Sequence, residues 1–174
     1  RLTYPFMLKN GQFIEASIQG YQGHFVLLQT DLKNVQKEYF ERRVAATFVY
    51  YPQPFGFQGE FNIGQGPQFN PETMNIENQD LFGGYVQSMY MIKTGKQIII
   101  PFARWHYYEG GKKHELDARS YLVNEQEIGI EWQPFENFEL VAMYTISDRT
   151  FEDSKRPDNR QTGRLLRLQA QFNF

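Results

Sequence analysis

The chain has 174 residues, a net charge of -2, a mean hydropathy of -0.59 and no cysteine. A chain of this length forms one domain or part of one, and its weakly acidic balance gives no reason to expect nucleic acid as a partner. The lack of cysteine excludes disulfides and thiolate metal sites, and the lack of any stretch near the roughly 18 apolar residues of a membrane-spanning helix argues against a helical membrane protein.

Eight segments along the chain have the composition and length of β-strands. Each has about 10 to 12 residues, which is enough for a tilted strand to cross a bilayer. The predicted strands are residues 12–21, 39–50, 55–64, 82–92, 97–108, 122–133, 138–147 and 163–174. The end of the first is ambiguous, because residues 25–28 either extend it or belong to the next loop, and Met89 and Met91 interrupt the polar face of the fourth.

Short and long connections alternate between these strands. The short ones are rich in Pro, Gly and Asn, which favour tight turns, and they are residues 51–54, 93–96 and 134–137. The long ones are polar and are predicted to be loops at residues 22–38, 65–81, 109–121 and 148–162. Outer-membrane β-barrels have short periplasmic turns and long external loops, so the alternation is typical of that topology.

The last predicted strand has the cleanest two-residue period. From Leu166 onward one face carries only apolar residues and the other only polar ones, and the sequence given ends on Phe174. A soluble sandwich also shows alternation, with its apolar face turned inward. The terminal aromatic and the strand lengths favour an all-β, antiparallel transmembrane β-barrel with its apolar face toward lipid.

The same period assigns a polar face to most of the other strands. In the second strand, for example, Val44 and Phe48 oppose Arg43 and Thr47. A Lys or Arg facing lipid at mid-depth costs roughly 2 to 4 kcal/mol, which explains why charges gather on one face. The residues predicted to line an interior are Glu41, Arg43, Thr47, Gln58, Glu60, Arg104, His106, Glu127, Glu131, Glu139, Arg167 and Gln169. Pro101 lies inside the fifth strand and predicts a β-bulge there.

Aromatic residues make up 17% of the chain and concentrate near the short connections. Such a distribution is expected of a girdle at one membrane interface, although aromatics also favour strands in general. The clustered residues are Tyr50, Tyr51, Phe55, Trp132, Phe135, Phe138, Phe172 and Phe174.

The sequence offers no convincing catalytic, metal or cofactor site. His24, His106 and His114 are not spaced with Ser and Asp as a nucleophilic triad. Glu127 and Glu131 lie about 13 Å apart along an extended strand, too far for a glycosidase pair. We therefore expect no enzyme and no cofactor, and the charges of both signs on the polar face indicate either a water-filled channel or a small barrel closed by ion pairs.

Three segments resemble a known family. They are residues 43–67, which read RVAATFVYYPQPFGFQGEFNIGQGP, residues 83–87, GGYVQ, and residues 100–105, IPFARW, followed by two tyrosines. From about Arg42 to its end the chain is similar to the phosphate-selective porin O and P family. The resemblance implies a sixteen-stranded, trimeric barrel that passes anions through an arginine ladder and a lysine cluster, of which eight strands form the C-terminal half. The strands here carry no lysine cluster, so general porin function is the part that carries over.

The sequence thus predicts a passive diffusion channel of the bacterial outer membrane for small polar or anionic solutes, with phosphate as one candidate. Residues 1–174 form a single β-barrel domain or the C-terminal portion of one, and residues 1–5 look like neither a processed start nor a targeting segment. Expected partners are outer-membrane lipid, the solutes, a homotrimer, and the barrel assembly machinery, for which Phe172 and Phe174 are the expected signal.

Three alternatives remain open from the sequence. They are a closed eight-stranded outer-membrane barrel with a structural or loop-mediated role, an outer-membrane enzyme, and a soluble ligand-binding barrel. The soluble barrel would bury Phe48, Ile130 and Leu168 together in a dry centre, whereas the membrane barrel would expose them.

Overall fold

The computed structural model describes residues 1–29, 35–112, 118–152 and 159–173. All regular structure in these ranges is β-strand, and none of their residues forms a helix long and apolar enough to span a bilayer. The strands are β1 (Leu2–Met7), β2 (Phe13–Gln29), β3 (Val35–Tyr50), β4 (Phe55–Asn70), β5 (Asn75–Tyr90), β6 (Ile92–Thr94), β7 (Gln97–Gly111), β8 (Ser120–Phe135), β9 (Phe138–Phe151) and β10 (Asn159–Phe172).

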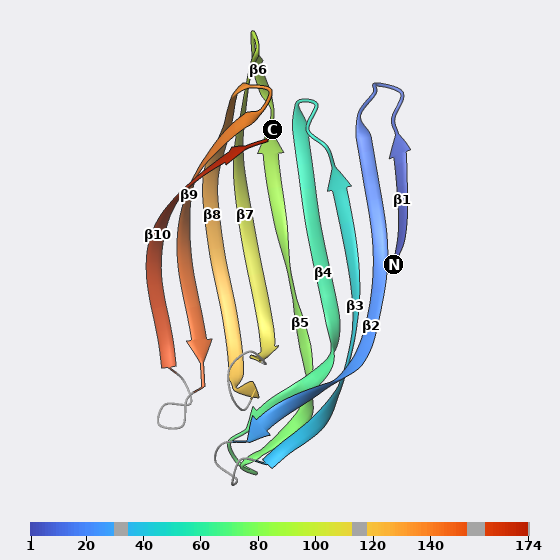
Figure 1. Ribbon diagram of the computed structural model, residues 1–174, viewed down its shortest axis with the longest axis vertical. Coiled ribbons are helices and arrows are strands. Elements are labelled where there is room, and N and C mark those ends of the chain that lie inside the picture. Colours follow the sequence, from blue (N-terminus) through green and yellow to red (C-terminus); the bar gives the residue numbers. More distant parts are fainter. Residues whose placement is uncertain (30–34, 113–117, 153–158, 174) are drawn as a thin grey trace.

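These ten strands form one antiparallel sheet in which chain neighbours are also spatial neighbours. The order is β1-β2-β3-β4-β5-β7-β8-β9-β10, with β6 paired to β7 alone. Figure 1 shows the sheet as a curved, open wall, with the tight turns at one end and the longer connections at the other. β1 and β10 are its two edges, so the described strands do not close on themselves.

All eight strands predicted from the sequence are present, and two short ones were missed. β1 escapes the pattern because Pro5 interrupts it, but proline is tolerated on an edge strand, and Pro5 is paired with Glu15 of β2. β6 continues the line of β5 after a break at Met91 and forms a two-residue hairpin with β7 around Gly95.

The long connections are shorter than predicted, because the strands continue into them. The segment 65–81 is the clearest correction: it is a paired hairpin with Gln65 opposite Asp80, and only residues 71–74 form its turn. β2 likewise extends through residues 25–28 to Gln29. The polar residues at these strand ends show where the apolar belt stops, whereas the backbone pairing between the strands continues beyond it. The predicted short turns at 51–54, 93–96 and 134–137 are confirmed as tight connections.

The bulge predicted at Pro101 is wrong. Pro101 is paired with Ile130 in an unshifted β7–β8 register, and Met89↔Phe102 and Ile92↔Ile99 keep one register on the other side. Between these two residue pairs, β7 has no paired residues on its β5–β6 side, because proline has no N–H to donate. The register irregularity of this region lies instead between Trp132 and Phe135.

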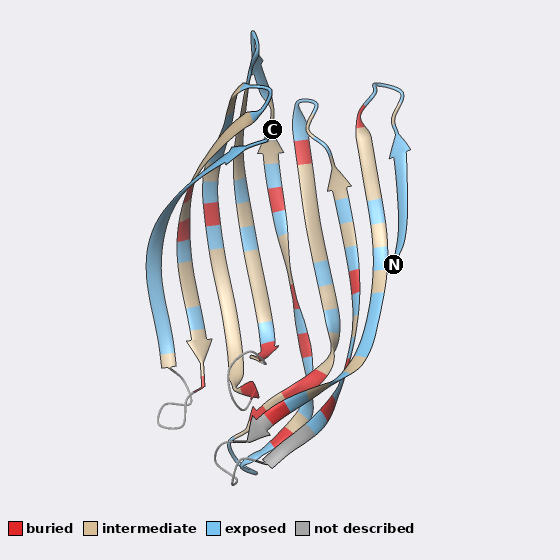
Figure 2. Cartoon of the chain, in the orientation of Figure 1, coloured by how far each residue is buried: buried red, intermediate tan, exposed pale blue. Residues whose placement is uncertain are grey.

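Figure 2 shows that buried positions are scattered along the strands among exposed ones, and the residue types at these positions are inverted relative to those of a soluble protein. Glu41, Gln87, Glu127 and Thr145 are buried, while many large apolar side chains are exposed. A small apolar core of Leu27, Tyr39, Phe69, Ile76 and Ala118 lies at the end of the long connections. Between the two ends, the buried apolar residues of the described strands, such as Ala45 and Met143, lie outside this core.

Candidate functional site

One face of the sheet collects the polar side chains, and we call it the concave face. Cross-strand partners share a face, so the register defines it directly. Thr47 lies opposite Glu60, and Gln87, Arg104, Glu127 and Thr145 form one row across β5, β7, β8 and β9. By this register all twelve interior residues predicted from the sequence lie on the concave face. That this face lines a pore stays a prediction.

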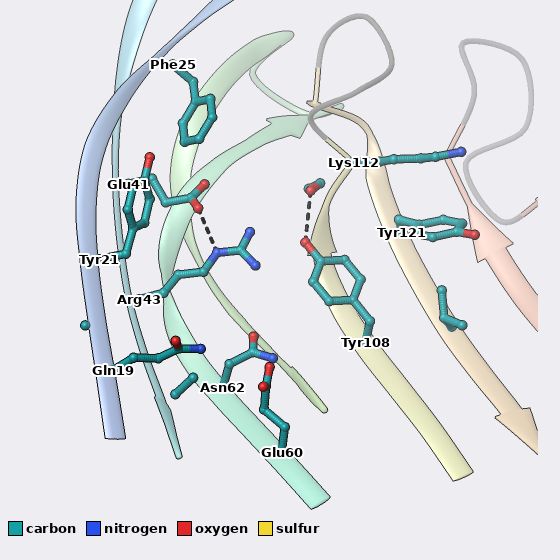
Figure 3. A pocket seen from close by; sticks show the side chains of 14 residues that line it. Gln19, Tyr21, Phe25, Glu41, Arg43, Glu60, Asn62, Tyr108, Lys112 and Tyr121 are labelled. Carbon is teal, nitrogen blue, oxygen red and sulfur yellow. Dashed lines mark hydrogen bonds and ion pairs between the residues drawn. The ribbon is translucent and has the colours of Figure 1, made fainter. Parts of the chain in front are cut away.

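The concave face is hollowed in the half that lies toward the long connections (Figure 3). A cavity of about 790 Å³ lies between side chains of β2, β3 and β4 and side chains of β7 and β8, which point toward one another. Tyr21, Phe25, Tyr108 and Tyr121 contribute rings to this cavity. Its charged and amide groups are Gln19, Glu41, Arg43, Glu60, Asn62 and Lys112.

Glu127 is the hub of the largest polar network on the concave face. Its Oε2 lies 3.3 Å from Arg104 Nη1 and 3.0 Å from His106 Nε2, and its Oε1 accepts a hydrogen bond from Thr145 Oγ1 at 3.1 Å. Arg104 Nε also donates to Gln87 Oε1 at 2.5 Å. The Glu127 side chain is only 8% exposed, and a buried carboxylate needs polar partners. Side chains of β7 and β9 supply them around β8, and β5 contributes through Gln87, which accepts from Arg104.

A second ion pair lies on β3 itself. Arg43 Nε donates to Glu41 Oε1 at 2.7 Å, and the Glu41 side chain is only 2% exposed. The two residues are two positions apart and therefore point to the same face. The pair neutralises the only cation that β3 presents to the cavity among the side chains described there.

Glu125 and Arg149 form a third pair, which the sequence reading missed. Glu125 Oε1 accepts hydrogen bonds from Ser147 Oγ at 2.7 Å and from Arg149 Nε at 2.8 Å. Arg149 was assigned to a loop, whereas β9 extends to Phe151 and brings it into register with Val123. Glu15, Tyr21 and Tyr108 were also missed, although the period-two pattern of their predicted strands places them on this face. Phe25 and Tyr121 were missed because they lie in predicted connections.

Other concave-face charges have no oppositely charged partner within the described residues. Glu60 accepts only from Thr47 Oγ1 at 3.3 Å, and Glu131 accepts from Gln133 Nε2 at 2.6 Å. Glu139 and Arg167 form no ion pair in the described part of the chain.

The opposite, convex face is apolar and exposed. Phe48 is 42% exposed, Ile130 44% and Leu168 70%. A soluble barrel would bury these three residues together, so their exposure argues against the soluble alternative. Arg42 and Arg164 are the charged residues of the predicted segments that fall on this face, and both lie toward the long connections, where Arg42 donates to Gln65 at 2.6 Å.

Aromatic rings lie at two levels of the convex face. Near the tight turns, Phe135 and Phe138 stack with centroids 5.5 Å apart. Toward the long connections, Phe82 and Tyr107 stack at 5.3 Å. Along β7, Ile99 is paired with Trp132 of β8, and the eight residue steps from Ile99 to Tyr107 span about 27 Å of strand. Phe172 is exposed at the turn level, and Phe174 lies outside the described residues.

The histidines do not assemble into a site. His106 belongs to the Glu127 network, His24 lies beside Phe40 with ring centroids 5.4 Å apart, and His114 lies outside the described residues. No group of three or more His, Asp or Glu that could hold a metal ion occurs within the described ranges.

An antiparallel sheet that is polar on its concave face and apolar on its exposed convex face is consistent with the wall of a porin barrel. The family model described as phosphate-selective porin O and P matches residues 27–174, and the chain belongs to this family. The family is a class of channels rather than of enzymes, and it implies an outer-membrane location. No curated protein and no solved structure gives a significant match.

Proposed function

We propose that this chain forms part of the wall of a water-filled channel through which small polar solutes diffuse across the outer membrane. The observation that carries the proposal is the inverted burial: ion pairs on the concave face and exposed Phe48, Ile130 and Leu168 on the convex face. A buried charge needs partners or water, and an exposed apolar face needs lipid or a protein partner. A channel wall meets both requirements with one alternating sequence.

The direction of the two edge strands supports a larger closed barrel. β1 and β10 both run toward the tight-turn end, since each is antiparallel to a strand that starts there. Direct closure would thus create a parallel seam in an otherwise antiparallel sheet. Nine strands lie along the sheet path, so an odd number of further strands gives the even count usual in bacterial barrels. Seven would give the sixteen that the family resemblance implies.

The same edges weigh against the closed eight-stranded alternative. Such a barrel would join the first and last crossing strands and fill its interior with side chains. Here β2 pairs on both sides, with β1 and β3, and the concave face holds an open cavity instead of packed side chains.

The convex face fits a bilayer in height. The two aromatic levels lie about 27 Å apart along β7, which a strand tilt of about 35 to 45° reduces to about 19 to 22 Å of height, near the roughly 25 Å apolar band of outer-membrane barrels. We assign them to the two membrane interfaces. Phe172, at the turn level, is proposed to take part in recognition by the barrel assembly machinery, and a homotrimer is the assembly that the resemblance suggests.

Conductance in planar bilayers tests the proposed function. The purified full-length protein should insert from detergent and produce steady, ohmic current steps. Liposomes containing it should swell in small sugars or amino acids. A protein that inserts, as judged by resistance of its strands to protease, but gives neither current nor swelling would contradict the channel and favour a structural barrel.

A further inference from the structure

The charges on the concave face are unbalanced toward the acidic side. Within the eight segments predicted to cross the membrane, the acidic residues on this face are Glu15, Glu41, Glu60, Glu125, Glu127, Glu131 and Glu139. The permanently cationic residues are Arg43, Arg104 and Arg167. Seven carboxylates thus face three guanidinium groups, and these segments place no lysine on the face.

The arginines that an anion would need are already engaged. Arg43 is paired with Glu41 at 2.7 Å, and Arg104 with Glu127 at 3.3 Å. Because an arginine held by a carboxylate donates its hydrogen bonds there, it offers a passing phosphate little net charge. Arg167 is the exception, since it forms no ion pair in the described part of the chain.

The carboxylates, by contrast, are in excess of their partners. Glu60, Glu131 and Glu139 have only neutral partners or none in the described ranges, and Glu15 reaches only the largely exposed Arg1 at 3.7 Å. These residues belong to β2, β4, β8 and β9, so the negative field covers the wall and does not define a single ion site.

The described residues at the two ends of the wall do not reverse this acidic excess. At the long-connection end, Arg149 is paired with Glu125, and Arg119 with Glu152 at 3.0 Å. Lys112 also lines the cavity at this end, and its Nζ lies 4.7 Å from the centroid of the Tyr121 ring. At the tight-turn end, Lys9, Lys93 and Lys96 are exposed and lie in turns and in β6, outside the crossing segments.

We infer that the channel prefers cations, including small organic cations, over phosphate and other anions. The inference rests on the proposed channel function and departs from the selectivity in the family's description. Charged side chains along a pore set ion selectivity, and low-dielectric walls focus their field onto the solute path. The wall described here thus attracts cations and repels anions.

Reversal potentials across a bilayer with a KCl gradient test the inference. The wild-type protein should pass K⁺ several-fold better than Cl⁻, and added phosphate should not block the current. The triple variant Glu60→Gln, Glu131→Gln and Glu139→Gln should lower the K⁺/Cl⁻ permeability ratio several-fold. Arg167→Gln should raise it, and Glu109→Gln, which removes an exposed carboxylate paired in register with convex-face residues, should leave it unchanged.

Each outcome separates the two proposals. A steady current with Cl⁻ preferred, or a ratio that the triple variant does not change, overturns the cation preference and leaves the channel intact. The absence of any steady current from inserted protein overturns both. A current that phosphate blocks at low concentration also overturns the inference, because it reveals an anion site that outweighs the acidic wall.

Discussion

The two faces of the same strands differ in composition and exposure. On β10, Leu168 projects from the convex face and Gln169 from the concave face, although they are adjacent in sequence. On β8, Ile130 is 44% exposed, while Glu127, which faces the other way, is buried among polar partners. Alternation alone does not show which face of the strands points to the interior of the barrel. The location of the charged residues shows it.

An arginine on the convex face should give the largest effect. Leu168→Arg places a charge at mid-depth of the apolar belt and should destabilise the membrane-inserted protein by about 2 to 4 kcal/mol. Gln169→Arg is the matched control and should cost far less, because its side chain lies on the polar face. Urea unfolding in lipid vesicles measures both. Equal costs at the two positions would contradict the assignment of faces.

The Glu127 network should contribute the next largest effect. Glu127→Gln leaves Arg104 and His106 without their carboxylate and should destabilise the protein by about 1 to 3 kcal/mol. The double variant with Arg104→Gln should lose less than the sum of the two single variants, because the pair is coupled. A double-mutant cycle by urea unfolding checks this, and strictly additive losses would show that the pair contributes nothing.

Alanine substitutions at two glycines test how tightly the concave face is packed. A Cβ at Gly129 would lie 2.4 Å from Phe102 Cζ, whereas one at Gly163 has no heavy atom within 4 Å. Gly129→Ala should therefore cost about 1 to 2 kcal/mol through displacement of the ring. Gly163→Ala should be close to neutral in the same unfolding assay. Reversed costs would contradict the placement of Phe102 over Gly129.

The smallest effect is expected where the strands leave the proposed membrane belt. The hydrogen bond from Arg160 holds the pKa of the Asp148 carboxyl below its ordinary value, and the pair lies beyond the crossing segments. Because the pKa is lower in the folded state, the pair stabilises the fold at pH values above the ordinary pKa of the carboxyl. This stabilisation is lost as the pH falls through the lowered pKa. NMR titration should show the low pKa in the wild type and a normal one in Arg160→Gln. An ordinary pKa of Asp148 in both proteins would contradict the hydrogen bond between Arg160 and Asp148.

The facing of the strands was predictable because a two-residue period is a local property. Val44, Phe48 and Arg43 need no tertiary information to be assigned to opposite faces. The ends of the strands were not predictable in this way. Gln65 and Asp80 look like loop residues, yet they are hydrogen-bonded to each other across β4 and β5 beyond the apolar belt.

The polar partners were the hardest part to predict. Glu127 and Arg104 were both expected on the interior face, but their contact depends on the β7–β8 register, which no single strand specifies. Arg149 was missed because the end of β9 was placed too early. The sequence nevertheless contained the acidic excess, which only became meaningful once the pairs were known and the unpaired carboxylates could be separated from the paired ones.

The central claim is that the convex row contacts lipid and the concave row contacts water, and the absence of native cysteine allows a direct test. Single cysteines at Phe48, Ile130 and Leu168, and at their neighbours Thr47, Glu131 and Gln169, would each carry a spin label in vesicles. We predict that the first three labels collide with dissolved oxygen and not with a water-soluble nickel complex, and that the second three do the opposite. The same accessibility at neighbouring positions, or the reverse pattern, would contradict the account.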